Sequence, residues 1–371
     1  MTDPFRTPSG KPRARALGLA FPGSPGPLNA ITDVPGVAVG YTTLVSGSGP
    51  LEVGRGPVRT GVTAILPRPR AHLTQPVFAG ISSFNGNGEM SGSHWIDEAG
   101  RFALPITITN THSCGLTRDA TLKWAAARYP NTFADSFGLP VAAETYDGYL
   151  NDINGFHVQD AHVFAAIDTA TTGAIEEGSV GGGTGMICFG FKAGSGTASR
   201  RVGFDGTEYT VGIFVQANFG YRDDLTVAGQ RLGARLHAEA AAGAPATDQE
   251  LSSIIAVVAT DAPFLPHQMK RLARRPAIGM GRVGGYGRHG SGDIFIAFST
   301  ANAAATDDDA KGLQSARFVP DNQIDPFFEA VVQAMEEAIL NSMIANEAMT
   351  GRDGNHIPAL PRSGLQRALG L

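Results

Sequence analysis

The sequence is poor in cysteine and in charge. Only two of its 371 residues are cysteines, Cys114 and Cys188, and neither belongs to a C-x-x-C pair. Two cysteines cannot form the disulfide framework of a small secreted scaffold, so we expect two reduced, buried thiols. Charged residues make up 17% of the chain and hydrophobic residues 42%, a balance that excludes intrinsic disorder. The chain can therefore bury a substantial core.

Long apolar runs are also missing. No stretch reaches about 18 uninterrupted apolar residues, and residues 1–15 lack the apolar segment of a secretory signal. A net charge of −5 offers no basic surface for nucleic acid. We therefore expect a cytoplasmic protein whose partners include neither membrane nor nucleic acid. Without a long low-complexity linker, residues 30–371 are expected to form one domain, preceded by a loose N-terminal arm of residues 1–29.

Motifs for a metal or a nucleotide are incomplete. The nine histidines include no H-E-x-x-H pair, and His157 and His162 do not share a helical face. Residues 279–284 fit G-x-G-x-x-G but follow a basic helical pattern instead of a strand. The glycine run that begins at Gly181 lacks the Lys-Ser/Thr ending of a phosphate-binding loop, which favours a turn or a close backbone contact. We expect no metal and no cofactor.

Apolar patterning predicts strands that are covered by helices. Helical spacing is clearest from Asp325, which can cap a helix with Pro326 in its first turn, and continues until Gly351. Because the predicted strands are apolar on both faces, helices must cover them in a layered α/β or α+β sandwich. Buried strands are predicted at residues 62–66, 105–109, 212–216, 254–259 and 294–299, and further helices at residues 117–129, 160–172 and 266–275.

Two segments offer a nucleophile. His112-Ser113-Cys114 sets a thiol beside a base, but neighbouring residues on a strand point to opposite faces, which favours simple burial of Cys114. The second segment, Ser252-Ser253, leads directly into the apolar run of residues 254–259. Hydroxyl residues are common where strands begin, so the residues alone favour a strand boundary over a catalytic Ser253.

Five short segments, in a fixed order, favour a catalytic Ser253. They are NGNGEM at 85–90, ETYDGYLND at 144–152, VQANFG at 215–220, SSIIAVVATDAP at 252–263 and SGD at 291–293. With these phrases the sequence from about Ala30 to the C-terminus resembles the family of L-aminopeptidases, D-amidase/esterases and β-peptidyl aminopeptidases. The resemblance implies an α+β fold, namely a four-layer αββα sandwich like that of N-terminal-nucleophile hydrolases, and assembly as a homotetramer of αβ units.

Members of that family cut themselves immediately before a serine. The match puts the cut between Ser252 and Ser253, which would give an α chain of residues 1–252 and a β chain of residues 253–371. Ser252 stands where the family has Gly or Asn, so a cut before Ser252 stays open. A freed α-amine, with a pKa of about 7.7 to 8, can act as the base for the serine hydroxyl. Before cleavage this nitrogen is an amide, so processing and activity should be coupled.

The resemblance also implies an orienting group and an oxyanion donor. Ser291 and Asp293 would orient Ser253 and its amine, and their spacing of two predicts that both side chains lie on one face. Asn218 would donate to the developing oxyanion. Without the resemblance, the pair could equally be a turn-capping serine and a strand-end aspartate, and Asn218 an ordinary loop amide.

Two residues of the second phrase complete the implied site. Tyr146 would assist the oxyanion or the nucleophile, and Glu144 would hold the free ammonium of the substrate, because a desolvated ammonium needs an anion. Alternate positions on a strand share a face, which predicts that the two side chains lie together. The alternative is a surface glutamate and a core tyrosine.

The sequence thus predicts a self-processing aminopeptidase or amidase. Its substrates would be short peptides, amides or esters with a free N-terminal amine, carried on an L-, D- or β-residue. A related hydrolase of nylon-type ω-amino-acid oligomers is an alternative, as is an ornithine acetyltransferase, although threonine is the nucleophile expected there. A non-enzymatic binding protein, in which the glycine-rich phrases simply make turns, is the remaining alternative.

Overall fold

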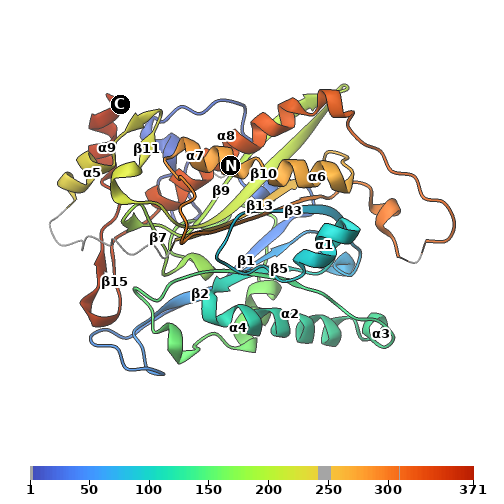
Figure 1. The fold of residues 1–371 in the computed structure, drawn as a ribbon, viewed down its shortest axis with the longest axis horizontal. Helices are drawn as coiled ribbons and strands as arrows, with labels where there is room; N and C mark the ends of the chain where they lie inside the picture. The colour runs from blue at the N-terminus through green and yellow to red at the C-terminus, as the bar shows by residue number, and fades with distance from the viewer. Residues whose placement is uncertain (1–2, 241–251, 309) are drawn as a thin grey trace.

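The computed structural model describes residues 3–240, 252–308 and 310–371, and these form four layers (Figure 1). A six-stranded sheet has the order β4-β3-β14-β13-β10-β9, and a four-stranded sheet has the order β1-β2-β5-β6. Helices α6 and α8 pack on the first sheet, with α7 against α8, and helices α2 and α4 pack on the second. The four-layer αββα sandwich implied by the resemblance is confirmed.

The bounds of these elements are as follows. The six-stranded sheet contains β3 (Val77–Gly86), β4 (Arg101–Phe102), β9 (Ser195–Phe204), β10 (Thr207–Asn218), β13 (Ser253–Thr260) and β14 (Gly292–Ser299). The four-stranded sheet contains β1 (Ala38–Ser46), β2 (Val58–Leu66), β5 (Ile106–Asn110) and β6 (Val141–Thr145). The covering helices are α2 (Cys114–Arg128), α4 (Asp160–Asp168), α6 (Pro266–Ala273), α7 (Pro276–Arg282) and α8 (Asp325–Ile344).

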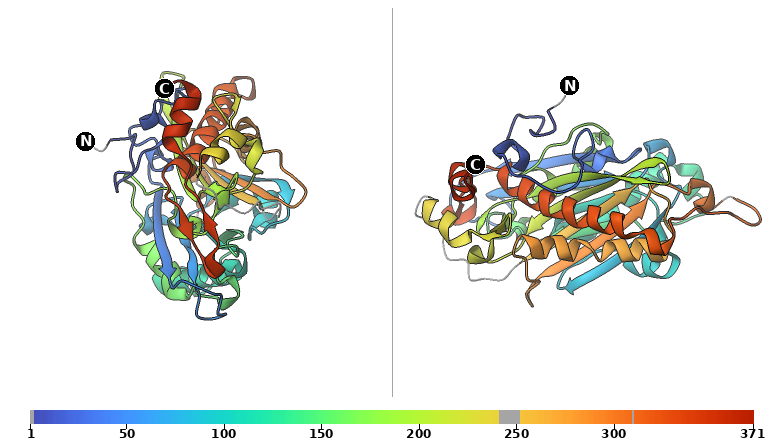
Figure 2. Two further views of the ribbon diagram at one scale, coloured as in Figure 1. Left: turned by 90° about the vertical axis from the view of Figure 1, so that its left-hand side faces the viewer. Right: turned by 90° about the horizontal axis from the view of Figure 1, so that it is seen from above.

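Smaller elements surround this sandwich. The further helices are α1 (Ser93–Ala99), α3 (Pro130–Phe133), α5 (Gly233–Glu239) and α9 (Arg362–Leu369). Three two-stranded ribbons are formed by β7 (Ile187–Cys188) with β8 (Phe191–Lys192), β11 (Thr226–Val227) with β12 (Gln230–Arg231), and β15 (Met349–Thr350) with β16 (His356–Ile357). Figure 2 shows α8 crossing one face of the molecule, with α6 and α7 beside it.

All five predicted strands exist, and the four predicted helices exist with shifted ends. Helix α8 begins at Asp325 with Pro326 in its first turn, as predicted. Two details were wrong: Ile324 instead of Asp325 is the N-cap, without a side-chain hydrogen bond, and the helix ends at Ile344, before Gly351. It ends early because side chains take its last carbonyls. Asn346 Nδ2 donates to Ser342 O at 2.6 Å, and Arg362 Nε donates to Ile344 O at 2.9 Å.

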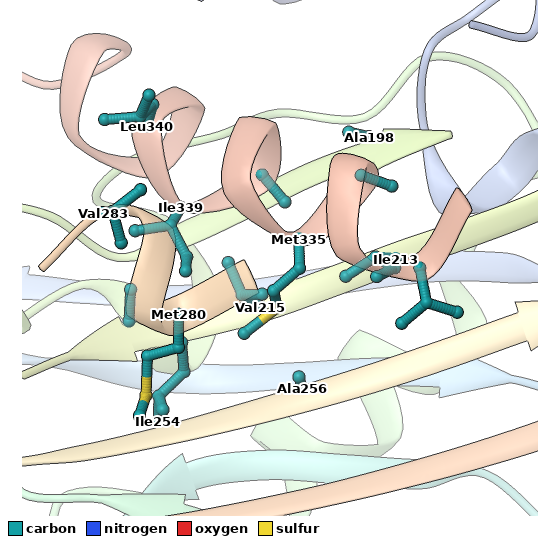
Figure 3. Packing of buried hydrophobic residues seen from close by; sticks show 14 of the residues in the cluster. Ala198, Ile213, Val215, Ile254, Ala256, Met280, Val283, Met335, Ile339 and Leu340 are labelled. Atoms are coloured by element: carbon teal, nitrogen blue, oxygen red, sulfur yellow. The ribbon is translucent and has the colours of Figure 1, made fainter. Parts of the chain in front are cut away.

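Strand β13 is the central element of the core. Its residues Ile254, Ala256 and Val258 belong to the cluster beneath α6, α7 and α8, whereas Ile255, Val257 and Ala259 belong to the cluster between the two sheets. Figure 3 shows the first cluster, in which Met335 and Ile339 of α8 approach Val215 of β10, and Met280 of α7 approaches Ile254. Burial on both faces explains why this strand reads as an uninterrupted apolar run.

The N-terminal arm is packed against the sandwich, so the expectation of a loose arm was wrong. Arg13 is buried, and its guanidinium donates to Glu177 Oε2 at 2.5 Å and to Thr197 O at 2.8 Å. Arg15 Nε donates to Glu337 Oε1 of α8 at 2.7 Å. These charged contacts fix the arm because a buried guanidinium requires hydrogen-bond partners.

The glycine-rich stretches have structural positions. Residues 279–284 span the end of α7, where a Cβ on Gly279 would collide with Met335 of α8. The run at Gly181 is a short 3-10 helix pressed against other backbone, so the expected close backbone contact is confirmed. Within the described part of the chain, no helix combines the length and the apolar character that crossing a membrane requires.

Candidate active site

Strand pairing sets Ser253 between two other strands at one end of the six-stranded sheet. Ser253 is the first residue of β13, opposite Asn218 of antiparallel β10 and beside Gly292 of parallel β14. Directly opposed residues of an antiparallel pair point to the same face, with Cβ atoms about 5 Å apart. The Ser253 hydroxyl and the Asn218 amide are therefore neighbours on the face that looks toward the four-stranded sheet.

The Ser253 side chain contacts the peptide bond that precedes it. Its Oγ donates to Ser252 O at 2.6 Å, and the Gly292 backbone N–H donates to the same oxygen at 3.0 Å. Ser253 is only 5% exposed. A hydroxyl thus lies against a carbonyl that a second, fixed donor already polarises, an arrangement in which the hydroxyl can attack that carbonyl.

Ser291 and Asp293 are joined by a short hydrogen bond, which confirms that their side chains lie together. Ser291 Oγ donates to Asp293 Oδ1 at 2.6 Å, and Asn85 Nδ2 donates to Asp293 Oδ2 at 3.0 Å. Burial raises the pKa of the Asp293 carboxyl, although these donors and the Ile254 backbone N–H act against that rise. Asp293 is therefore a buried carboxyl surrounded by neutral donors only.

Asn85 is a site residue to which the sequence assigned no role. It belongs to the NGNGEM phrase, whose chain runs along β14: Asn85 Nδ2 also donates to Arg288 O at 3.2 Å, and Asn87 Nδ2 donates to Gly290 O at 2.7 Å. A Cβ on Gly292 would collide with the Asn87 carbonyl, so only glycine fits there. The phrase holds the Ser291–Asp293 turn in place.

Asn218 is held in its orientation by backbone groups. Its Oδ1 accepts from Ile187 N at 2.9 Å, and its Nδ2 donates to Tyr146 O at 3.0 Å. Tyr146 follows the end of β6, and a Cβ on Gly148 would collide with its hydroxyl group. The structure thus brings Tyr146 to Asn218, and through Asn218 to Ser253.

Glu144 lies behind this group and outside the cavity lining. It is 3% exposed, and its carboxylate accepts from Glu89 N at 2.9 Å and from the Thr111 hydroxyl. Burial raises the pKa of this carboxyl. A Cβ on Gly88 would lie 3.2 Å from Glu144 Oε1 and 3.3 Å from Gly292 Cα. Gly88 alone therefore separates Glu144 from Gly292, the residue that lies beside Ser253 in strand β14.

The expectation that Glu144 and Tyr146 share one strand face was wrong, because β6 ends at Thr145. The chain turns there. Asn151 Nδ2 donates to Asp147 Oδ1 at 3.0 Å, and Leu150 N donates to Asp147 O at 3.1 Å. Asp147 therefore starts a compact turn that carries Tyr146 and Tyr149.

A cavity of about 420 Å³ opens beside these residues. This size suits a small ligand. Its polar lining includes Tyr146, Asn218, Ser252, Ser291 and Asp293. Its wider wall is formed by apolar and aromatic side chains and by two arginines, namely Ile187, Phe219, Met280, Tyr149, Tyr221, Tyr286, Arg288 and Arg352.

The alternative nucleophile, Cys114, is buried in this structure. It begins helix α2, so the assumption that it lies on a strand was wrong, but its predicted burial is confirmed, as is that of Cys188. Burial raises the pKa of the Cys114 thiol, which suppresses the reactive thiolate. In residues 3–240, 252–308 and 310–371, no group of three or more His, Cys, Asp or Glu side chains could hold a metal ion.

Known proteins share this architecture along almost the whole chain. A β-peptidyl aminopeptidase of Sphingosinicella microcystinivorans is 52% identical over 369 residues, which cover 96% of this chain and 92% of that protein. The structure of an L-aminopeptidase D-Ala-esterase/amidase from Ochrobactrum anthropi matches with a TM-score of 0.91 and 48% identity, covering 97% of this chain and 99% of that one. A β-aminopeptidase from Burkholderia sp. matches with a TM-score of 0.87 and 44% identity, covering 96% and 98%.

These similarities define the class first: a hydrolase of the aminopeptidase kind, with the Ntn-hydrolase fold. Within that class, the model of peptidase family S58 matches residues 29–357. The chain belongs to peptidase family S58.

Proposed function

We propose that this chain cuts itself before Ser253 and then hydrolyses short peptides, amides or esters that carry a free N-terminal amine, with Ser253 as the nucleophile. One observation carries the proposal: the Ser253 hydroxyl lies 2.6 Å from the carbonyl oxygen of Ser252, at the first residue of a buried strand. The start of β13 at Ser253 favours a cut before Ser253 over a cut before Ser252.

The cut would begin as an N-to-O acyl shift. Ser253 Oγ attacks the Ser252 carbonyl carbon and forms a bond to it, while the carbonyl oxygen gains negative charge next to the Gly292 N–H. The hydroxyl proton passes to the Ser253 nitrogen, and the C–N bond breaks to leave an ester. Water then hydrolyses this ester, which gives the Ser252 carboxylate and a Ser253 residue with both a free amine and a free hydroxyl.

The freed amine would be the base in each later turnover. It takes the proton from Oγ as Oγ attacks the substrate carbonyl, and it returns that proton to the leaving amine or alcohol. Water then hydrolyses the acyl ester, which releases the acid and restores the Ser253 hydroxyl. Ser291 and Asp293 would orient the amine, since their hydrogen-bonded pair lies beside Ser253 in the neighbouring strand. Asn218 would donate to the oxyanion from the opposite strand, with Tyr146 assisting it.

Glu144 would attract the substrate ammonium from behind Gly88. Its two oxygens each accept one hydrogen bond, from Glu89 N and from the Thr111 hydroxyl, and a carboxylate oxygen has lone pairs for a further donor. An arriving ammonium would also lower the raised pKa of this buried carboxyl and so favour the anion.

The names of two similar proteins narrow the substrates to test. One is named a β-peptidyl aminopeptidase and the other an L-aminopeptidase D-Ala-esterase/amidase. We propose β-residues at the N-terminus as the preferred class, because the protein with 52% identity bears that name. Cytoplasmic residence and a homotetramer of αβ units stay predictions, and light scattering during size-exclusion chromatography tests the second.

Denaturing electrophoresis tests the cut. We expect two fragments from the wild-type protein and one intact chain from Ser253→Ala, with N-terminal sequencing of the smaller fragment beginning at Ser253. Ser252→Ala is the matched control, because it removes the neighbouring hydroxyl and should still be cut. A single wild-type band with full peptidase activity would contradict the mechanism.

Chromogenic amides test the reaction and the substrate class. We expect the processed protein to release p-nitroaniline from β-alanine p-nitroanilide faster than from the L- or D-alanine compounds. Release from 6-aminohexanoate oligomers alone would favour the nylon-type alternative. A processed protein without activity on any of these compounds would favour the non-enzymatic alternative.

A further inference from the structure

The cavity lining includes a turn near the C-terminus. Arg352 lines the cavity from this turn, together with Tyr149. The turn is fixed to the loop after β6: Arg352 N donates to Leu150 O at 2.9 Å, and Asn355 Nδ2 donates to Tyr149 O at 2.8 Å. A Cβ on Gly351 would collide with the Leu150 carbonyl, so the two segments are in close contact.

The Arg352 guanidinium differs from the other arginine of the cavity. Arg288 donates to Asp224 Oδ2 at 2.6 Å, and its guanidinium stacks on Tyr221 with 4.2 Å to the ring centroid. Arg352 is 28% exposed, and its Nε is buried without a hydrogen-bond partner among the described residues. Because Nε itself is closed off, a ligand acceptor would meet the guanidinium at the exposed part of the side chain, which lines the cavity.

The neighbouring carboxylate does not meet this need. Asp353 Oδ2 lies 4.0 Å from Arg352 Nε, beyond hydrogen-bond distance, and Asp353 Oδ1 accepts from Leu51 N at 2.8 Å. That second bond holds the carboxylate away from the guanidinium. The two cavity carboxylates, Asp224 and Asp293, are already bound by other donors.

We infer that Arg352 binds the C-terminal carboxylate of a short peptide substrate, so that dipeptides and tripeptides are preferred over amides without that charge. The inference rests on the proposed function, because it needs the scissile carbonyl to sit at Ser253. A guanidinium matches a carboxylate with two parallel hydrogen bonds, which makes arginine the residue suited to this task.

The distance between Arg352 and the Ser253 site permits a short peptide. Tyr146, whose carbonyl binds Asn218, precedes Leu150, whose carbonyl binds Arg352 N, by four residues, so these two backbone positions lie at most about 14 Å apart. A dipeptide or tripeptide carboxylate lies one or two residues beyond the scissile carbonyl, roughly 4 to 8 Å from it, which is within that limit.

Paired substrates test the inference on the processed enzyme. We would measure kcat/KM for β-alanyl-alanine, for β-alanyl-alaninamide and for β-alanine p-nitroanilide, with wild type, Arg352→Met and Arg128→Met. Arg128 is an exposed arginine at the end of α2 and controls for the loss of one positive charge. The expected result is a wild-type preference for the acid over the amide on the order of 10- to 100-fold.

Arg352→Met should abolish that preference by lowering kcat/KM for the acid alone, mainly through KM. The amide and p-nitroanilide rates should stay within about threefold of wild type, which also shows that the variant is folded and processed. Arg352→Lys should keep part of the preference, and Arg128→Met all of it. Equal wild-type rates on acid and amide, or an equal loss on all three substrates in Arg352→Met, would overturn the inference. If the wild type cleaves itself but hydrolyses none of the three, the proposed function fails instead.

Discussion

Two regions of this molecule satisfy their buried charges in different ways. In the α8 charge cluster, formed by Arg15, Asn29, Arg200 and Glu337, one carboxylate accepts from two guanidinium groups and an amide, at 2.6 to 2.9 Å. Burial acts to raise the pKa of Glu337, but the Arg15 hydrogen bond and the Arg200 charge outweigh it and hold the pKa below its usual range.

In the cavity, Arg288 and Asp224 pair with each other, but Asp293 meets neutral donors and Arg352 Nε meets no acceptor among the described residues. Asp293 is bound by a hydroxyl, an amide and a backbone N–H, and burial raises its pKa. Arg352 is left with an unsatisfied Nε in the part of the chain that the structure describes. In the α8 charge cluster the charges are fully paired and hold the fold together. In the cavity, Asp293 and Arg352 can still change their charge or their hydrogen-bond partners. Stability and activity should therefore depend on different residues.

The largest expected effect is on stability at the α8 charge cluster. Glu337→Ala would leave the buried Arg200 and the half-buried Arg15 without their carboxylate, which typically costs about 3–5 kcal/mol. We would measure urea unfolding on the Ser253→Ala background, so that every sample is one chain. Folded Glu337→Ala with Ser253 present should keep the wild-type rate per cleaved molecule. A lost rate in well-folded protein would contradict the separation of the two regions.

Asn218→Ala should lower activity instead of stability. Loss of one oxyanion donor lowers kcat by about 100- to 1,000-fold, equivalent to roughly 2.7–4 kcal/mol. Gln216 is the matched control, since it lies two residues earlier on the same face of β10 and its Nε2 donates to Thr109 O and Thr145 Oγ1. Gln216→Ala should lower stability and leave kcat for p-nitroanilides unchanged. Equal losses of kcat in both variants would argue against an oxyanion role.

Burial also explains which parts of the fold could be predicted from the sequence. Strand β13 was predictable because burial on both faces leaves an uninterrupted apolar run, and the resemblance supplied the four-layer arrangement. Strand order was not predictable from the pattern, because pairing joins segments that are far apart in the chain. The contact of Asn85 with Asp293 spans 208 residues, and no local signal marks it.

Local turns limited the prediction of the site. Alternation on a strand correctly placed Ser291 beside Asp293, but it failed for Glu144 and Tyr146, where the Asp147 turn ends β6. Arg352 has no motif at all. Its position in the cavity follows from the contact of its turn with Leu150, which only the fold reveals.

The buried Asp147 carboxyl should make the stability of the fold depend on pH. Burial raises its pKa to about 7, against hydrogen bonds from Thr60 and Asn151, and its Oδ2 has no partner among the described residues. Because the folded-state pKa lies above the unfolded value of about 3.9, the folded protein binds more protons between these two values. The stabilising contribution is thus present in acid and is lost as the pH rises through about 7.

Asp147→Asn removes this titration. Between pH 5 and pH 8 the free energy of unfolding of the variant, relative to the parent, should rise by roughly 2.5 kcal/mol, as measured by urea unfolding of the Ser253→Ala chain. An unchanged difference at the two pH values would show that Asp147 is ionised throughout.

The smallest effect is expected where charge is paired without burial. Glu52 accepts from Arg55 at 3.0 Å, but the two side chains are 65% and 83% exposed, so water and salt screen the pair. Glu52→Gln should change the free energy of unfolding by less than about 0.5 kcal/mol, in the same assay that detects Glu337→Ala. A loss comparable to that of Glu337→Ala would mean that pairing itself, and not burial, sets the cost of breaking an ion pair in this fold.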